Sequence, residues 1–310
     1  MHNVLVSDTI AQSGIEILQR AAHVDINDKI TGDELRAAIP TYDALIVRSR
    51  TKVTAPIIEA GARLQVIGRA GVGLDNIDVD AAKQRNIPVV NSATSAMVAV
   101  AEHTMGMMIA LARFIPHSDA SLKRGEWAKN KYMGVELNGK TLGLVGVGRI
   151  GSMVATRAVA FGMRVLAYDP YITPERAQEF GATLLNSLDD VLAQSDFVSI
   201  HTPLLPSTRG MIGMKEIGEM KPTARLVFCA RGGVVDESAL LESLNQNKIA
   251  GAALDVFENE PPGANPLLQH PRVVVTPHLG AMTEEAQTKA AIDVATQVAT
   301  ILNGAQRPQD

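Results

Sequence analysis

Three polar residues in the second half of the chain have types suited to one reaction. Arg231 follows an apolar run ending at Phe228, Glu260 follows one ending near Val256, and His278 follows Val273–Thr276. Histidine can take or give a proton near neutral pH, and a carboxylate beside it favours the protonated ring. A guanidinium binds a carboxylate with two parallel hydrogen bonds. Hydride exchange at a hydroxy acid is one reaction that needs these residue types, with the histidine handling the hydroxyl proton.

A glycine motif lies upstream of these residues, in LGLVGVGRIGSM. Gly146, Gly148 and Gly151 have the spacing GxGxxG, after an apolar strand pattern and before a helix pattern over Ser152–Phe161. This order of strand, turn and helix is typical of a dinucleotide-binding turn. The helix N-terminus would then face the phosphates with its N–H groups and positive dipole end.

Asp169 supplies a second signal for a dinucleotide. It ends the next predicted strand, Arg164–Tyr168, at about the 20-residue interval of the acidic residue that binds the adenosine ribose. A carboxylate at this position would repel a 2′-phosphate. The sequence therefore predicts NAD as the cofactor in preference to NADP.

Alternating strand and helix signals predict an α/β protein with parallel sheets covered by helices. In the first third of the chain, strands are predicted near Val4–Val6, Ala44–Val47, Val66–Ile67 and Val89–Val90. Helices are predicted around Ile15–Leu18, after the capping-box residues Thr31 and Glu34, and from Thr54 to Gly61. In the second half, strands are predicted near Thr141–Val145, Arg164–Tyr168, Phe197–His201, Arg225–Phe228, Ala250–Leu254 and Val273–Thr276.

Two longer helices, Met97–Arg113 and Glu284–Leu302, are expected to cross between two doubly wound domains. Residues 1–96 and 284–310 would form a flavodoxin-like substrate-binding domain, and residues 97–283 a Rossmann NAD-binding domain. His103 is polar within the first crossover helix, and we interpret it as a hydrogen-bonded helix residue, not a catalyst. The methionines around it are interpreted as packing residues.

Composition restricts the remaining possibilities. The chain has 310 residues, enough for two cores, with 46% hydrophobic and 20% charged residues. The net charge of −4 gives no reason to expect a nucleic-acid or membrane partner, and the single cysteine, Cys229, excludes an internal disulfide and a cysteine-based metal site. No metal is expected. The N-terminus MHNVLVSD lacks signal-peptide features, and no apolar run reaches the ~20 residues of a membrane span, so we expect a cytoplasmic enzyme.

Longer motifs resemble those of a known family over almost the whole chain. They are ELNGKTLGLVGVGRIG, HTPLLPST, CARGGVVDE, GAALDVFENEPP and TPHLGAMTEEAQ. The chain resembles the D-isomer-specific 2-hydroxyacid dehydrogenases, most of all D-3-phosphoglycerate dehydrogenases, in a short form without a C-terminal regulatory domain. The resemblance implies NAD-dependent oxidation of 3-phosphoglycerate to 3-phosphohydroxypyruvate, a step of serine biosynthesis, with His278 as the acid–base residue.

The resemblance also implies roles for individual residues. Arg231, Glu260 and His278 would be the catalytic residues. Cofactor contacts would come from Gly146, Gly148, Arg149, Ile150, Gly151, Asp169, Thr202, Cys229, Ala230, Asp255, His278 and Gly280. Asp255 would lie near the nicotinamide carboxamide, and Cys229 would be a small wall residue. Substrate contacts would come from Arg48, Ser49, Ala70, Gly71 and Val72.

The resemblance further implies a homodimer, or a homotetramer built from it. The nucleotide domains would pair through Met97–Val135, a segment that is apolar at first and basic and aromatic near Lys123, Arg124 and Trp127. The alternative is that Trp127 is buried within one subunit.

One departure from the family keeps the substrate open. Phosphoglycerate members commonly have a proline and then Gly-Asn-Thr or Gly-Asn-Ser before the crossover helix, where this chain has Ala93, Ala96 and Met97. An amide that could contact the substrate is therefore missing. A glyoxylate or hydroxypyruvate reductase and a D-lactate dehydrogenase remain alternatives. A relative that uses NAD binding to control assembly as a transcriptional co-repressor is an alternative of another class, disfavoured because no extended disordered flank is seen.

Overall fold

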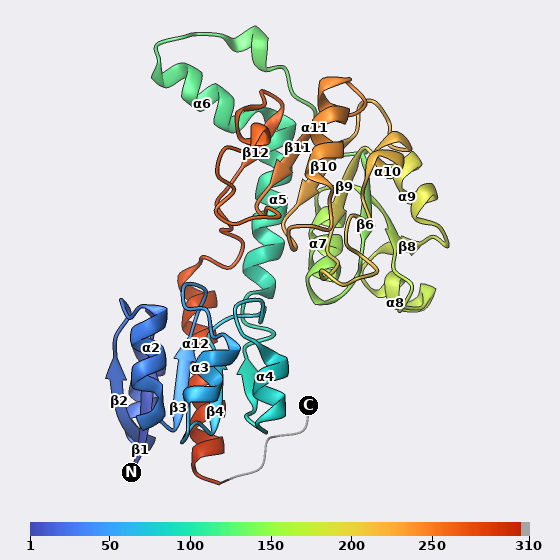
Figure 1. Cartoon of the computed structure of the whole chain (residues 1–310). Coiled ribbons are helices and arrows are strands. Elements are labelled where there is room, and N and C mark those ends of the chain that lie inside the picture. Colours follow the sequence, from blue (N-terminus) through green and yellow to red (C-terminus); the bar gives the residue numbers. More distant parts are fainter. Residues whose placement is uncertain (305–310) are drawn as a thin grey trace. The chain divides into compact units, whose positions relative to one another are not determined.

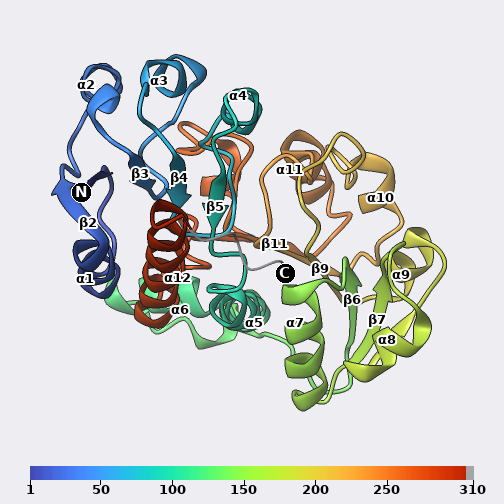
Figure 2. The same ribbon diagram turned by 90° about the horizontal axis from the view of Figure 1, so that it is seen from below.

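The computed structural model describes residues 1–304, which form two compact units, each built on a parallel β-sheet (Figures 1 and 2). The first unit comprises Met1–Ala96 and the described part of Ala281–Asp310, and the second comprises Met97–Gly280. The expected return segment 284–310 falls in the first unit as far as residue 304, and residues 305–310 lie outside the described residues.

The first unit has five strands in the order β2-β1-β3-β4-β5. The strands are β1 (His2–Val6), β2 (Ala22–Ile26), β3 (Ala44–Val47), β4 (Val66–Arg69) and β5 (Val89–Asn91). The helices are α1 (Gln12–Ala21), α2 (Gly32–Ala38), α3 (Ala55–Ala60), α4 (Val79–Gln84) and α12 (Glu284–Leu302), with a 3₁₀ turn, η1, at Ile39–Thr41. This strand order is that of the flavodoxin-like fold.

The core of the first unit lies on both faces of its sheet, because successive side chains of a strand point to opposite faces. Val4 and Val6 of β1 pack in a cluster with residues of α1 and α12, whereas Leu5 packs in a second cluster with residues of α2 and α3. The α1 and α12 helices approach closely: a Cβ at Gly14 would lie 2.8 Å from the Cβ of Ala291. The last helix is therefore part of the core begun by the first strand.

The second unit has seven strands in the order β12-β11-β10-β9-β6-β7-β8. The strands are β6 (Thr141–Val145), β7 (Arg164–Tyr168), β8 (Ala182–Leu184), β9 (Phe197–Ile200), β10 (Arg225–Phe228), β11 (Gly251–Leu254) and β12 (Val273–Val275). The helices are α5 (Met97–Arg113), α6 (Ile115–Lys123), α7 (Arg149–Ala160), α8 (Pro174–Glu179), α9 (Leu188–Gln194), α10 (Met214–Gly218) and α11 (Glu237–Asn245). Short 3₁₀ turns, η2 and η3, occupy Lys129–Tyr132 and Pro266–Gln269. The strand order reverses at β6, as in a doubly wound nucleotide-binding sheet.

Helix α5 is central to the second unit. It packs against α7 and against β10, β11 and β12. Its Met105, Met107, Met108 and Leu111 are buried in the main hydrophobic cluster, so the methionines fill the core between helix and sheet. In residues 1–304 no single helix has the length and hydropathy of a membrane span; α5 and α6 reach those values only as a pair, bent by 62°.

The structure confirms the predicted α/β class with parallel sheets. The capping box of α2 is present, with the Thr31 hydroxyl accepting the Glu34 N–H and Glu34 accepting the Thr31 N–H. Two strands were not predicted, β2 and β8. Polar residues interrupt both strands, His23 and Asp25 in β2 and Thr183 in β8, whereas the other two edge strands, β5 and β12, begin with two valines and were predicted. Helix α4, at Val79–Gln84, was also not predicted.

Candidate active site

The three predicted catalytic residues follow neighbouring strands of the second unit. Arg231 lies on the loop after β10, Glu260 on the loop after β11 and His278 on the loop after β12. The carboxyl ends of parallel strands meet at one edge of a sheet, where ligands bind in this class of fold. The structure places Glu260 and His278 in direct contact, with Nδ1 of His278 2.7 Å from Oε2 of Glu260.

The His278–Glu260 contact defines which ring nitrogen is available. The other carboxylate oxygen of Glu260 accepts the N–H of Phe257 at 3.1 Å, which orients the group. Burial raises the pKa of Glu260, but the hydrogen bond and charge of His278 lower it more, so the pKa lies below its ordinary value. An ionised carboxylate only accepts, so Nδ1 carries the hydrogen and Nε2 is left to exchange a proton.

Arg231 is positioned by its own loop. Its Nη1 donates to the carbonyl oxygen of Ala230 at 2.9 Å. The loop that carries Arg231 follows β10, which is the neighbour of β11, the strand that precedes Glu260. Among residues 1–304, no three histidine, cysteine or acidic side chains gather into a possible metal site.

The glycine turn between β6 and α7 is closely packed. Gly146 has a φ of 90°, in the region that favours glycine. A Cβ at Gly151 would lie 2.3 Å from the carbonyl oxygen of Gly146, so only glycine fits at that position. A Cβ at Gly148 would meet nothing within 4 Å, so this residue faces open space.

The first turn of α7 includes Arg149 and Ile150. Its N-cap residue is Gly148, and no side chain in the described part of the chain caps this helix end. An uncapped helix N-terminus presents N–H groups and a positive dipole end to an anion. Asp169 lies beside the same turn, because its Oδ2 accepts the Val147 N–H at 2.8 Å and its Oδ1 accepts the Tyr171 N–H at 2.9 Å.

Thr202 and Cys229 lie at the ends of the next strands. The hydroxyl of Thr202 is buried and has no hydrogen-bond partner within residues 1–304. Its methyl group is close to the glycine turn, 3.1 Å from where a Cβ of Gly146 would lie. Burial raises the pKa of the Cys229 thiol to about 12, so this cysteine is a poor nucleophile at neutral pH. Ala230 follows it and accepts the Arg231 hydrogen bond.

Asp255 directly follows β11 and is hydrogen-bonded to the loop that carries His278. It is 1% exposed, and its carboxylate accepts the N–H groups of Leu279 at 2.8 Å and Gly280 at 2.9 Å. It also accepts the hydroxyl of Thr276 at 2.6 Å. Thr276 was not among the predicted site residues, although its position gives a signal: it is a hydroxyl residue directly after a buried strand and two positions before His278.

The five predicted substrate contacts lie in the first unit, on the loops after the neighbouring strands β3 and β4. The Arg48 N–H donates to Asp8 at 2.6 Å, and Nη2 of Arg48 lies 2.6 Å from the Sδ of Met282. Burial lowers the pKa of Arg48, although the charge of Asp8 opposes this. Ser49 is exposed.

The second of these loops holds Ala70, Gly71 and Val72. Ala70 donates its N–H to the Val47 carbonyl oxygen at 2.8 Å and is buried. The carbonyl oxygen of Gly71 accepts the Ser92 N–H at 3.0 Å, and the carbonyl oxygen of Val72 accepts the Asn91 side chain. The backbone of this loop is therefore held by both neighbouring strands.

The second unit fits a bound NAD molecule on several independent features. Open space faces Gly148, the first turn of α7 has no side-chain cap, and a buried hydroxyl at Thr202 has no partner in the described structure. The Asp169 carboxylate stands beside the turn, where a ribose would need an acceptor.

Comparison with known proteins supports the assignment of the second unit as an NAD-binding domain. The sequence profile described as D-isomer specific 2-hydroxyacid dehydrogenase, NAD binding domain, matches residues 105–280. The chain is 50% identical, over 98% of its length, to a D-3-phosphoglycerate dehydrogenase of Methanocaldococcus jannaschii. Among solved structures, the TT0316 protein from Thermus thermophilus matches with a TM-score of 0.91 and 32% identity, over 99% of both chains. A glyoxylate reductase from Paecilomyes thermophila matches with a TM-score of 0.88 and 31% identity, over 99% of this chain and 98% of that one.

The chain spans 58% of the length of the M. jannaschii protein, and 55% to 58% of several other curated relatives. The match to solved chains is nearly complete in both directions. The glycine turn between β6 and α7, the histidine–glutamate contact and these similarities agree with one another. The chain belongs to the D-isomer-specific 2-hydroxyacid dehydrogenase family.

Proposed function

We propose that the protein is an NAD-dependent D-2-hydroxyacid dehydrogenase whose substrate pair is 3-phosphoglycerate and 3-phosphohydroxypyruvate. The contact of 2.7 Å between His278 and Glu260 carries the reaction class. The identity of 50% to a protein named D-3-phosphoglycerate dehydrogenase supports the substrate.

His278 is proposed as the group that exchanges a proton with the substrate oxygen. In oxidation, its Nε2 takes the hydroxyl proton while the hydride leaves the carbon; in reduction, the same nitrogen returns a proton to the carbonyl oxygen. NAD, when bound, supplies the hydride acceptor and, when reduced, the hydride donor. Glu260 keeps the hydrogen on Nδ1 and stabilises the positive ring. Arg231 binds the substrate carboxylate through two parallel hydrogen bonds.

Arg48 is proposed to bind the phosphate of the substrate, with Ser49 and the backbone of Ala70, Gly71 and Val72 as further contacts. The Arg48 guanidinium is partly desolvated, as the lowered pKa indicates. A partly desolvated cation attracts an anion more strongly than one in bulk water, because the local dielectric constant is lower.

A keto acid without phosphate is the alternative substrate. It is supported by the missing amide at Ala93–Met97 and by the similarity to a glyoxylate reductase. The test compares kcat/KM for phosphohydroxypyruvate, hydroxypyruvate, glyoxylate and pyruvate with NADH. We expect phosphohydroxypyruvate to be preferred, and Arg48→Ala to remove that preference while the affinity for NADH is kept. Equal kcat/KM for the phosphorylated and unphosphorylated substrates would reject phosphate recognition.

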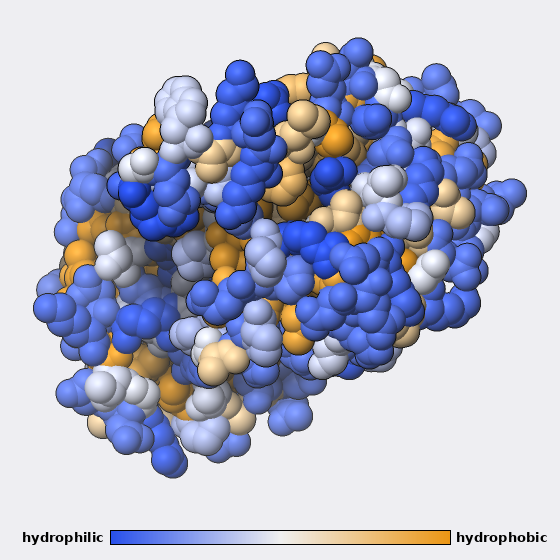
Figure 3. Space-filling model, turned by 90° about the horizontal axis from the view of Figure 1, so that it is seen from above, coloured by the Kyte–Doolittle hydropathy of each residue, from blue (hydrophilic) through white to orange (hydrophobic). Residues whose placement is uncertain are grey.

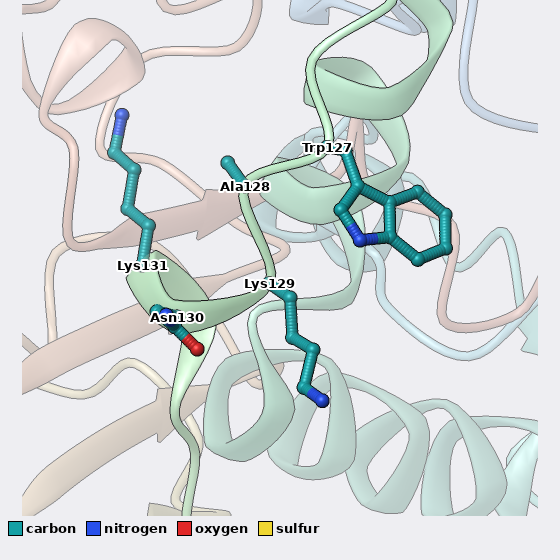
Figure 4. A pocket seen from close by; sticks show the side chains of 5 residues that line it. All are labelled: Trp127, Ala128, Lys129, Asn130 and Lys131. Atoms are coloured by element: carbon teal, nitrogen blue, oxygen red, sulfur yellow. The ribbon is translucent and has the colours of Figure 1, made fainter.

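Pairing of two copies through Met97–Val135 is the proposed assembly. Five large apolar residues of this segment are exposed in the single chain: Val98 (42%), Ile115 (49%), Leu122 (56%), Trp127 (83%) and Met133 (84%). A shallow pocket of about 490 Å³ is lined by Trp127–Lys131, with Trp127 and Lys129 extending from one side of the segment and Lys131 from the other (Figure 4). On the face viewed from above, apolar and polar surface are mixed, as they are over most protein surfaces (Figure 3).

Sedimentation tests the pairing. We expect a dimer or a larger assembly at micromolar concentration, and a shift toward monomer for Trp127→Ala combined with Leu122→Ser. Tyr171→Ser, which changes another exposed aromatic residue outside the segment, is the control and should leave assembly unchanged. A monomer for the unaltered chain would reject the proposal.

A further inference from the structure

His103 lies on α5 and contacts two residues from two different strand ends. Its Nε2 is 3.2 Å from Oδ1 of Asp255 and 3.2 Å from the hydroxyl oxygen of Thr276. The side chain is 21% exposed, so most of the ring is enclosed. These are the two residues that hold the loop carrying His278 to the end of β11.

The hydrogen bonds around Nε2 determine which ring nitrogen is protonated. Thr276 has one hydroxyl hydrogen, which we assign to Oδ1 of Asp255 at 2.6 Å, because Sδ of Met107 lies farther away, at 3.7 Å, and is a weak acceptor. An ionised carboxylate offers only acceptors. Nε2 of His103 therefore faces two acceptors, and it must carry a hydrogen to make either contact.

Asp255 depends on such donors because it is a buried carboxylate. Oδ1 accepts from His103, Thr276 and the Leu279 N–H, and Oδ2 accepts from the Gly280 N–H. Three of these four donors share Oδ1, so the buried charge is concentrated at the oxygen that His103 and Thr276 contact. Loss of one donor would leave a buried charge less compensated and its loop less tightly held.

The held loop determines where the acid–base residue lies. Three consecutive N–H groups, those of His278, Leu279 and Gly280, all donate to Asp255: the first to its carbonyl oxygen at 2.9 Å, the others to its carboxylate. His278 itself has a φ of 54°, in the left-handed region that a residue with a side chain adopts only when its surroundings impose it. The contacts of Asp255 supply that constraint.

We propose that His103 is a positioning residue for the reaction: as an Nε2–H donor clamped between Asp255 and Thr276, it fixes the Thr276–Gly280 loop and thereby the ring of His278. The proposal rests on the proposed function for its effect on catalysis, but its effect on the loop is independent of that function. His103 touches neither reacting group and acts through Asp255 and Thr276.

Three substitutions of His103 distinguish its role as a hydrogen-bond donor from its role in filling space. His103→Leu keeps the bulk and removes the donor. His103→Gln places an amide N–H close to the position of Nε2, whereas His103→Asn has the same amide on a shorter side chain that cannot reach Asp255. The Gln and Asn variants therefore form a matched pair.

Two measurements are made on the intact protein. The first is amide hydrogen exchange of the peptide containing Leu279 and Gly280, which should be faster than in the unaltered protein for Leu and Asn and near normal for Gln. The second is steady-state kinetics, in which kcat should fall about tenfold or more for Leu and Asn, with KM and NADH affinity little changed and with Gln restoring most of the loss.

The outcomes are distinguishable. Unchanged loop exchange in a folded Leu or Asn variant overturns the proposal, as does a Gln variant that is as impaired as Asn. If the unaltered protein reduces no 2-keto acid, the proposed function fails, and the exchange data alone still decide whether His103 holds the loop. If Leu does not fold, the Gln and Asn pair gives the same decision.

Discussion

Two loops, one in each unit, are held in the same way by a buried aspartate. In the first unit, Asp8 follows β1 and accepts bonds from the Arg48–Thr51 loop after the neighbouring strand β3. In the second unit, Asp255 follows β11 and accepts bonds from the loop after the neighbouring strand β12. Each aspartate takes a threonine hydroxyl at 2.6 Å, from Thr51 and from Thr276.

The two aspartates differ in the nitrogen-bearing side chain that contacts the carboxylate. Asp8 pairs with Arg50, whose side chain is 48% exposed, at 3.1 Å. Asp255 instead contacts His103, whose side chain is 21% exposed. Both carboxylates are buried, so the difference lies in their partners: water can partly replace the half-exposed Arg50, whereas His103 is mostly enclosed.

This difference matches the proposed roles of the loops. A loop that binds a substrate tolerates small displacements better than a loop that positions the proton-exchanging group, since the reacting atoms must be aligned closely. The second loop carries His278 and is held by three consecutive N–H groups, all to one residue.

His278→Ala should show the largest effect. General acid–base catalysis typically contributes about 10²–10⁴-fold, so kcat should fall by that amount while NADH binding, measured by fluorescence titration, is largely kept. Arg48→Ala, the matching change in the first loop, should mainly raise KM for the phosphorylated substrate. Near-normal turnover of the His278 variant would exclude the proposed division of roles.

Asp255→Asn should destabilise the protein more than Asp8→Asn. An amide in place of Asp255 turns one acceptor into a donor that faces bound N–H or O–H groups, and breaking a buried charged network costs about 3–5 kcal/mol. For Asp8 we expect about 1–3 kcal/mol, because water can reach the exposed arginine side. Urea unfolding followed by circular dichroism gives both values, and equal losses would remove the contrast.

The free energy of unfolding should also depend on pH differently in Asp255→Asn and in the unaltered protein. Burial raises the pKa of Asp255, but hydrogen bonds from His103, Thr276 and Leu279 lower it more, so it lies below its ordinary value of 3.8. A depressed carboxyl pKa contributes stability above that ordinary value, and the contribution is lost as the pH falls through the folded-state pKa. The free energy of unfolding should therefore fall more steeply with acid in the unaltered protein than in Asp255→Asn.

Arg50→Ala should have the smallest effect. An ion pair with a half-exposed partner contributes about 1 kcal/mol or less, since water screens the charge and the side chain loses entropy. Urea unfolding should show a loss of that size, and the loss should shrink in high salt. A loss as large as that of Asp255→Asn would mean that Arg50 is as important to its loop as Asp255 is to the other loop.

Much of the fold could be read from local patterns. The strands of both sheet centres, the capping box at Thr31 and the last helix follow from apolar runs and short-range signals. The edge strands β2 and β8 could not, because His23 and Asp25 interrupt β2 and Thr183 interrupts the short strand β8. The edge strands β5 and β12, which each begin with two valines, were predicted, so an unbroken apolar run decided which strands could be found from the sequence.

The candidate site likewise contains residues that the sequence was enough to select and one, His103, whose contacts only the tertiary structure shows. Residue type and position after a strand were enough to select Arg231, Glu260, His278 and the glycine turn as candidates, because the ends of parallel strands meet at one edge. His103 had no such signal: a lone histidine in an apolar helix reads as a packing or hydrogen-bonded residue, and its partners are 152 or more positions away in the chain. Only the packing of α5 against β11 and β12 brings its Nε2 to Asp255 and Thr276, since contacts between distant segments depend on how whole elements pack and not on the local sequence around either one.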